Sequence, residues 1–241
     1  MREGDRALSD VTVHAKSLLR FFKALSVTTS RPSDEDGFSD VYLRTGKAVA
    51  DGGVSPTQVL TGISTDGVVV GRMLVSCNGD LPAPVGISAT TLPWLTAVLK
   101  EVAADDKEAL VTLRVNPSTL DSALVPETLP HREHKFVLQA VEDFPVETCE
   151  NALDGSTARA EVTTKDGDVL PVGKVTQWPS KYLKLLAQMS QQLDGEDVRI
   201  YRIKHPASTH VVTIGPWRGA LPANPYPLDI DVAEPDDQEA L

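Results

Sequence analysis

The sequence predicts an α+β fold, in which a few well-separated helices stand among many short strands. Three observations lead to this prediction. Helical periodicity occurs in three segments, at 13–26, 92–103 and 178–193. The chain between them consists largely of short β-branched runs bounded by Gly, Asp, Asn or Pro. A similar order of elements also recurs along the chain, which favours a repeated unit of one helix with several strands.

Each predicted helix has an apolar stripe and a recognisable beginning or end. In the first helix, Leu18, Phe22 and Leu25 share one face. The second and third helices begin at Pro93 and Pro179, because proline suits the first turn of a helix. Both continue with apolar residues three or four positions apart, and an Asp-Gly pair ends the third.

The remaining structured segments are predicted to be strands. They alternate apolar with polar residues over short distances, and turn residues separate them. The predicted strand regions are 41–50, 57–64, 67–76, 109–116, 135–141, 158–177, 197–204 and 210–217. The repeat is clearest between 81–116 and 170–203, where a Leu-Pro element and a short strand lead into a helix, an acidic turn and an alternating strand.

Length and charge limit the possible classes of protein. The chain has 241 residues and a formal net charge of -11, with 41% hydrophobic and 24% charged residues. That length has room for two domains with buried cores. The excess of acid argues against a protein coated in nucleic acid over its whole surface, although it leaves a local basic surface open. Two cysteines, no apolar run long enough to cross a bilayer and a polar N-terminus predict a cytoplasmic protein.

No catalytic or metal-binding constellation is evident in the sequence. His131 and His134 form an HxxH pair that lacks further ligands at a suitable spacing, so a solvated loop is the better interpretation. Cys149 lies in an acidic, turn-like segment without a histidine at motif spacing. A small α+β hydrolase or transferase would need such a cluster. We therefore expect a protein that is not an enzyme and that needs no cofactor or metal.

Basic residues are concentrated on helix faces that carry no acid. In the first helix three of them recur at i, i+4 and i+7, opposite the apolar stripe. In the third helix two lysines align with Gln188 and Gln191, and the second helix contributes one lysine beside Glu101. These faces are either ordinary solvated surfaces or surfaces that meet a polyanion. The residues concerned are Lys16, Arg20, Lys23, Lys100, Lys181 and Lys184.

Three stretches together resemble the DNA sliding clamps, and most closely their bacterial beta-clamp branch. ISTDGVVVGRM at 63–73 is similar to a turn and strand of that family, and LPAPVGISATTLPWLTAVLKEV at 81–102 to its passage into a helix. KFVLQAVEDFPVE at 135–147 is similar to the strand and Asp-Phe-Pro exit that close a clamp domain. The resemblance implies helices on the inner face of a ring and sheets outside.

The resemblance also implies the domain boundaries. Residues 11–147 would form a complete clamp-like domain after an N-terminal extension at 1–10, and 148–222 a second, partial one. Residues 223–241 are rich in proline and acid and would form a disordered acidic tail, and 29–38 a mobile loop. With only three helical segments, the second domain is expected to lack its first helix, within 146–170.

In function, the resemblance implies a non-enzymatic processivity factor that encircles duplex DNA without sequence preference and tethers a replicative polymerase or other DNA-acting partner. The six basic residues would contact the DNA backbone, and the chains would associate into a ring in the cytoplasm, at the nucleoid. The alternative is a clamp-fold interaction protein that forms no ring and modulates a replication complex.

Overall fold

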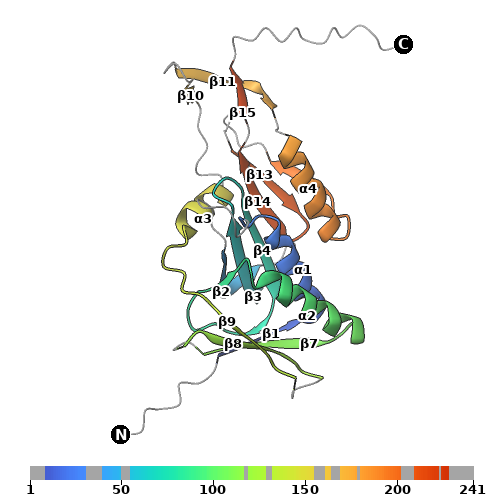
Figure 1. Cartoon of the computed structure of the whole chain (residues 1–241). Coiled ribbons are helices and arrows are strands. Elements are labelled where there is room, and N and C mark those ends of the chain that lie inside the picture. The colour runs from blue at the N-terminus through green and yellow to red at the C-terminus, as the bar shows by residue number, and fades with distance from the viewer. Residues whose placement is uncertain are drawn as a thin grey trace, which may run out of the picture.

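The computed structural model describes the chain in segments separated by short gaps. The described residues are 9–30, 40–49, 55–116, 119–128, 132–154, 161–163, 169–177, 180–201, 209–222 and 224–227. Within them, helices and antiparallel sheets form an elongated molecule (Figure 1). The predicted α+β class is confirmed. The expected extension at 1–10, loop at 29–38 and tail at 223–241 lie largely outside the described residues.

The N-terminal half contains two copies of a strand, a helix and a run of antiparallel strands. The first copy is β1 (Ser9–His14), α1 (Ala15–Ser26), β2 (Asp40–Val49), β3 (Pro56–Thr65), β4 (Val70–Ser76) and β5 (Asn78–Gly79). The second copy is β6 (Val85–Ser88), α2 (Leu92–Asp105), β7 (Leu110–Val115), β8 (Asp121–Pro126) and β9 (His134–Val137). The repeated unit predicted from the sequence is therefore present.

The two copies exchange their first strands. β1 pairs with β7 of the second copy, with Thr12 opposite Thr112, and their hydroxyls are hydrogen-bonded at 2.9 Å. In return, β6 pairs with β2 of the first copy, with Val41 opposite Ile87. Each sheet of this half therefore contains a strand from the other copy, and neither copy can complete its sheet alone.

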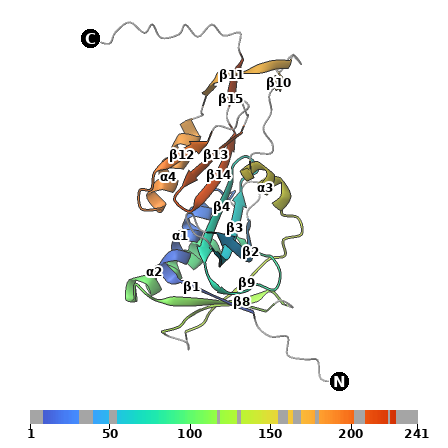
Figure 2. The same cartoon turned by 180° about the vertical axis from the view of Figure 1, so that it is seen from behind.

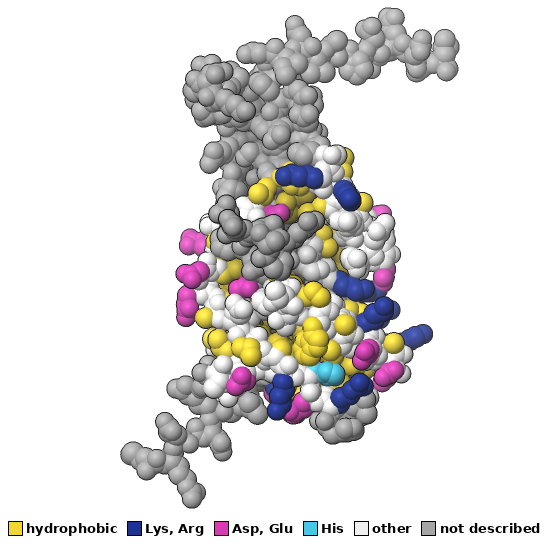
Figure 3. All heavy atoms as spheres, in the orientation of Figure 1, with side chains coloured by type: hydrophobic (Ala, Val, Ile, Leu, Met, Phe, Trp, Pro, Cys, Tyr) yellow, Lys and Arg dark blue, Asp and Glu magenta, His cyan; other side chains and the backbone are white. Residues whose placement is uncertain are grey.

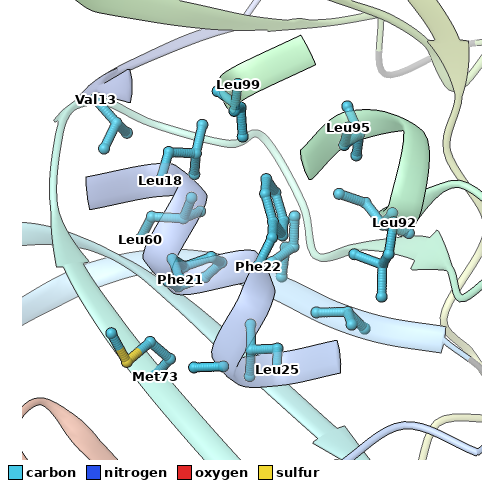
Figure 4. Close-up of a cluster of buried hydrophobic side chains, with 14 of the residues drawn as sticks. Val13, Leu18, Phe21, Phe22, Leu25, Leu60, Met73, Leu92, Leu95 and Leu99 are labelled. Atoms are coloured by element: carbon cyan, nitrogen blue, oxygen red, sulfur yellow. The ribbon is translucent and has the colours of Figure 1, made fainter. Parts of the chain in front are cut away.

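The helices α1 and α2 pack against each other in the main core. The close-up in Figure 4 shows Leu99 beside Leu18 and Leu92 beside Phe22, so the two helices run antiparallel. These side chains are almost completely buried. Beneath them, α1 lies directly on β3, because a Cβ at Gly62 would come within 2.6 Å of the Phe21 ring. Burial of this aromatic and aliphatic surface supplies most of the stability of this half.

The stretch at 63–73 forms a hairpin between β3 and β4. Asp66 Oδ1 accepts hydrogen bonds from the amides of Val68 and Val69 at 2.9 and 2.7 Å, and Gly67 takes the positive φ of 84° that the turn needs. Further on, a Cβ at Gly71 would lie 2.5 Å from Thr28 Oγ1 at the end of α1. Glycine therefore lets this strand approach the end of α1 closely.

The C-terminal half adds strands to the same framework. Its elements are α3 (Val146–Asp154), β10 (Glu161–Thr163), β11 (Val169–Gln177), α4 (Ser180–Gln192), β12 (Val198–Tyr201), β13 (Thr209–Ile214), β14 (Trp217–Pro222) and β15 (Asn224–Pro227). β14 pairs with β4, which joins the halves in a seven-stranded sheet of order β12-β13-β14-β4-β3-β2-β6. The other sheets have the orders β5-β1-β7-β8-β9 and β10-β11-β15.

Two expectations from the sequence differ from the structure. The helix expected to be missing from 146–170 is present as α3, which begins just after Phe144 and Pro145. The first residues of the expected tail, 224–227, form β15, which pairs with β11. The helix escaped prediction because only two of its residues, Cys149 and Leu153, are fully buried, and they form a narrow stripe of one turn. The strand β15 was not predicted because the segment that contains it is rich in proline and acidic residues, which is typical of a disordered tail.

The helix α3 lies on the opposite face of the seven-stranded sheet from α1 and α4. Figures 1 and 2 show it alone on that side, whereas α1, α2 and α4 follow one another on the other side. Its Cys149 and Leu153 pack with Tyr42 of β2 and Ala220 of β14. The neighbouring residues of β14, Trp217 and Leu221, belong instead to the main core with α1 and α4.

Candidate nucleic-acid interface

The three helices that carry the predicted basic residues lie next to one another. α1 is in contact with α2 on one side and with α4 on the other. Both views of the ribbon agree on this order, and several Lys and Arg side chains lie along the same edge of the molecule in Figure 3. We call the solvent-facing side of α1, α2 and α4 the helical face. Residues far apart in the sequence thus form one surface.

On α1, the basic residues occupy the side that faces away from the core. Lys16 is exposed, and Arg20 and Lys23 are half-buried, whereas Leu18 and Leu25 are buried. This is the amphipathic arrangement expected from the spacing at i, i+4 and i+7. The helix continues directly from β1, so its orientation is fixed by the pairing of that strand with β7.

Arg20 is not a free cation, because it forms an ion pair with Asp194. Asp194 follows α4 and adopts a positive φ of 61° before Gly195, which ends the helix. The side chains of Arg20 and Asp194 are 39% and 63% exposed, so water screens their attraction. The pair connects α1 to the end of α4. It also reduces the positive charge that Arg20 offers to an anion.

On α4, both predicted lysines are exposed. Lys181 and Lys184 lie one turn apart, and the exposed Gln188 continues the same face. Lys181 Nζ lies 4.9 Å from the centre of the Tyr182 ring, which is itself buried. A cation over an aromatic face is weakly stabilised at an exposed site, so Lys181 is partly held in position.

On α2, the lysine has a more mixed setting. Lys100 is exposed and is followed by the exposed Glu101. Glu101 Oε2 lies 3.9 Å from Arg132 Nη2, at ion-pair distance. The carboxylate of Glu101 nevertheless stands next to Lys100 in the helix and offsets its positive charge. α2 therefore contributes less positive charge to the helical face than α1 or α4.

The helix on the opposite face of the sheet is acidic. α3 carries Glu147, Glu150 and Asp154 and no basic residue. The sequence did not reveal this contrast, because the helix itself escaped prediction. The arrangement gives the seven-stranded sheet a basic helix, α1, on one face and an acidic helix, α3, on the other.

Arginines of the sheet hold α3 in place. Arg44 of β2 is paired with Glu150, and Arg218 Nε of β14 donates a hydrogen bond to the Leu153 carbonyl oxygen at 2.9 Å. Arg72 of β4 lies directly opposite Arg218 in the ladder. Burial, and then the adjacent Arg218, lower the pKa of Arg72, and Asp154 and Glu150 partly offset this. α3 thus bridges the strands of both halves.

The described residues contain no group of three or more His, Cys, Asp or Glu side chains that could hold a metal ion. Cys149 lies in α3 and not in a turn, and burial raises the pKa of its thiol to about 11. Cys77 is also buried, with a pKa of about 11. Neither thiol is therefore ionised at neutral pH, as a nucleophile would need to be. No helix in the described part of the chain is long and apolar enough to span a bilayer.

Comparison with known proteins places the fold. No protein-family model matches the sequence, and no curated protein does either. Among solved structures, the sliding clamp of Caulobacter crescentus matches with a TM-score of 0.56 at 14% identity, over 94% of this chain and 67% of that one. The DNA polymerase III beta chain of Streptococcus pneumoniae matches with a TM-score of 0.58 at 10% identity, over 95% and 68%.

A third clamp gives the same result. The DNA polymerase III beta subunit of Pseudomonas aeruginosa matches with a TM-score of 0.55 at 16% identity, over 89% of this chain and 64% of that one. The chain therefore spans about two thirds of the length of the clamps it matches. The described chain has the fold of the bacterial DNA polymerase sliding clamps, in a shorter form.

Proposed function

We propose that this protein is a sliding-clamp-like processivity factor, which surrounds duplex DNA with its helical face and tethers a replicative polymerase or another DNA-acting protein. The observation that carries the proposal is the separation of charge across the clamp fold. Basic side chains of α1 and α4 share one side of the seven-stranded sheet, and the acidic α3 lies on the other. A duplex would be attracted more strongly to the first side than to the second, where arginines of the sheet partly neutralise the acids of α3.

The proposed DNA contacts are electrostatic and carry no sequence information. Lys16, Lys23, Lys181 and Lys184 would meet backbone phosphates, with smaller contributions from Lys100 and from Arg20, which Asp194 partly neutralises. Weak contacts of this kind suit sliding, because no single position on the duplex is strongly preferred. The protein would do no chemistry itself and would need no cofactor.

A ring requires chains to meet, and the sheets offer edges for that. Among the described residues, β12 and β9 are end strands of the two larger sheets. Val198 and Ile200 on β12 are 40% and 48% exposed, which is unusual for apolar residues of a strand. We propose that such edges pair between copies, which would also shield them from unspecific pairing.

The proposed contacts are tested by the salt dependence of binding to a short fluorescein-labelled duplex. Each lost phosphate contact lowers the slope of log affinity against log salt by roughly 0.9, so Lys181→Gln with Lys184→Gln should lower it by about 2. Lys47→Gln with Lys135→Gln is the matched control, because it removes two exposed lysines from strands. An equal loss in both double variants would contradict the assignment to the helical face.

Ring formation is tested by mass and by topology. Light scattering should give a defined oligomer, and the protein should remain on circular DNA but leave linear DNA through its ends. A single monomeric mass across micromolar concentrations would exclude the homo-oligomeric ring. That result would favour the alternative, a clamp-fold protein that modulates a replication complex without encircling DNA.

A further inference from the structure

A polar pocket lies where α1 ends and α2 begins. Because the two helices are antiparallel, the last turn of α1 lies beside the first turn of α2, as Phe22 and Leu92 show in Figure 4. The pocket has a volume of about 360 Å³. None of its lining residues is acidic, and they include Lys23, Ser26, Thr29, Ser30, Leu92 and Thr96.

Three of the four hydroxyl groups in this pocket already donate hydrogen bonds to nearby carbonyl oxygens. Ser26 Oγ donates to the Lys23 carbonyl at 2.8 Å, and Thr29 Oγ1 to the Ser26 carbonyl at 3.1 Å. Thr96 Oγ1 donates to the Pro93 carbonyl at 2.8 Å. These hydroxyls satisfy backbone groups of the two helices and are not free donors.

Ser30 is different, because its hydroxyl has no partner among the described residues. Its side chain is only 4% exposed, yet Oγ makes no hydrogen bond there. Leaving a buried hydroxyl unpaired is unfavourable, and such groups are rare in folded proteins. A ligand that accepts a hydrogen bond from Ser30 Oγ would remove this penalty.

The first turn of α2 supplies a second kind of donor to the same pocket. The Thr91 hydroxyl is hydrogen-bonded to Ser88 Oγ at 3.0 Å and does not cap the helix, and the first turn carries no acid. Within the described residues, no acceptor is found for the Leu92 amide. The N-terminus of a long helix with free amides attracts anions.

Lys23 supplies the positive charge. It is half-buried in the last turn of α1, and no carboxylate in the described part of the chain lies within ion-pair distance of it. An ammonium, an unpaired hydroxyl and a helix N-terminus therefore face one acid-free pocket. Together they match a tetrahedral anion with several acceptor oxygens.

We propose that this pocket binds a phosphate group, held by Lys23, the Ser30 hydroxyl and the N-terminus of α2, and that the phosphate is one of the DNA backbone. The proposal rests on the proposed function for the source of the phosphate. It adds one discrete contact at the end of the helical face, where the other lysines make loose ones. Inorganic phosphate has the same chemistry and is the alternative source.

The test uses the full chain and two probes. In the first arm, inorganic phosphate is titrated at constant ionic strength while the amide resonances of Ser30 and Leu92 are followed by NMR. In the second arm, anisotropy measures the affinity for a fluorescein-labelled duplex at low salt. Ser30→Ala is the main variant, since it removes one hydroxyl without changing charge or filling the pocket. Ser26→Ala is the matched control, because its hydroxyl already serves a carbonyl.

The expected result is a saturable shift of both resonances in the wild-type protein and in Ser26→Ala, and its loss in Ser30→Ala. Duplex affinity should fall about tenfold in Ser30→Ala, the value of a hydrogen bond to a charged group, with an unchanged salt slope. Lys23→Gln should weaken binding to the duplex and lower the slope of log affinity against log salt by about 1.

Two outcomes would overturn the proposal in different ways. If phosphate shifts neither amide resonance and Ser30→Ala leaves the affinity for the duplex unchanged, the pocket is not a phosphate site. The proposed function would still be supported if Lys181→Gln with Lys184→Gln weakened binding to the duplex. If phosphate shifts the resonances but Ser30→Ala leaves the affinity for the duplex unchanged, the pocket binds free phosphate and not the DNA backbone.

Discussion

In the N-terminal half, α1 and α2 pack against each other on one side of the sheets, whereas in the C-terminal half the seven-stranded sheet separates α3 from α4. The cause is visible in the side chains. α1 buries Phe21, Phe22 and Leu25, enough to cover both a strand and a second helix. α3 buries only Cys149 and Leu153 and is held by arginines of the sheet. The same order of elements can therefore place a helix on either face, depending on its apolar width and charge.

Truncation of the α1–α2 core should have the largest effect. Phe22 is 1% exposed between the two helices, so Phe22→Ala should lower the free energy of unfolding by about 4 kcal/mol. Urea denaturation followed by circular dichroism measures this loss. Ser17→Ala on the same helix serves as the control. A loss near that of the control would mean that the two helices do not share one core.

Truncation under α3 should cost less and act locally. Leu153 is fully buried against the sheet, and Leu153→Ala should weaken the docking of α3 by about 3 kcal/mol. Hydrogen exchange should then accelerate in α3 amides and remain unchanged in α1. Thr148→Ala, on the exposed side of α3, is the matched variant. Equal acceleration in both helices would show that the halves unfold as one unit.

The buried thiols allow the halves to be compared by pH. Burial raises the pKa of Cys149 from 9.0 to about 11, so the unfolded chain loses this proton first as pH rises. Its contribution to stability is therefore complete below pH 9 and is lost toward pH 11, by on the order of 2 kcal/mol.

Cys77 provides the same measurement in the N-terminal half, because its pKa is also raised to about 11. Thermal or urea unfolding between neutral pH and pH 11 should show a smaller alkaline loss in Cys149→Ala and in Cys77→Ala than in the wild type. An unchanged alkaline loss in the variant with both substitutions would contradict the buried, neutral state of these thiols.

The smallest effect is expected where the halves meet through the ion pair of Arg20 with Asp194. Both side chains are well exposed, so Asp194→Asn should change the free energy of unfolding by less than about 1 kcal/mol. It should nevertheless free Arg20 and steepen the salt slope of duplex binding by up to about 1. Asp197→Asn, in the same loop, is the control. Identical slopes would show that Arg20 does not face the DNA.

The sequence predicted those parts of the fold in which local pattern and tertiary environment agree. Leu18, Phe22 and Leu25 lie on the buried side of α1 as their spacing requires, and Asp66-Gly67 forms the expected turn. α3 was missed because Cys149 and Leu153 make a stripe too narrow to stand out from its acidic surroundings. Its position depends on arginines of distant strands, which no local pattern contains.

The candidate site shows the same limit. The basic side of α1 follows from the spacing of Lys16, Arg20 and Lys23, but the pairing of Arg20 with Asp194 depends on how two distant helices pack. The pocket beside Ser30 depends on the antiparallel contact of α1 with α2. Whether the Ser30 hydroxyl has a hydrogen-bond partner depends on the tertiary structure around it, and the sequence does not contain that information.

The exchange of β1 and β6 between the two N-terminal copies has a consequence for biosynthesis. β1 is among the first described residues to leave the ribosome, yet its partner β7 ends at Val115. Until that residue emerges, β1 lacks its longest strand pairing, although α1 can already pack on β3 and β4. We therefore expect this half to fold late and slowly for its size, because its first contacts span long stretches of chain. Binding by a nascent-chain chaperone during that interval would protect the exposed leucines and phenylalanines.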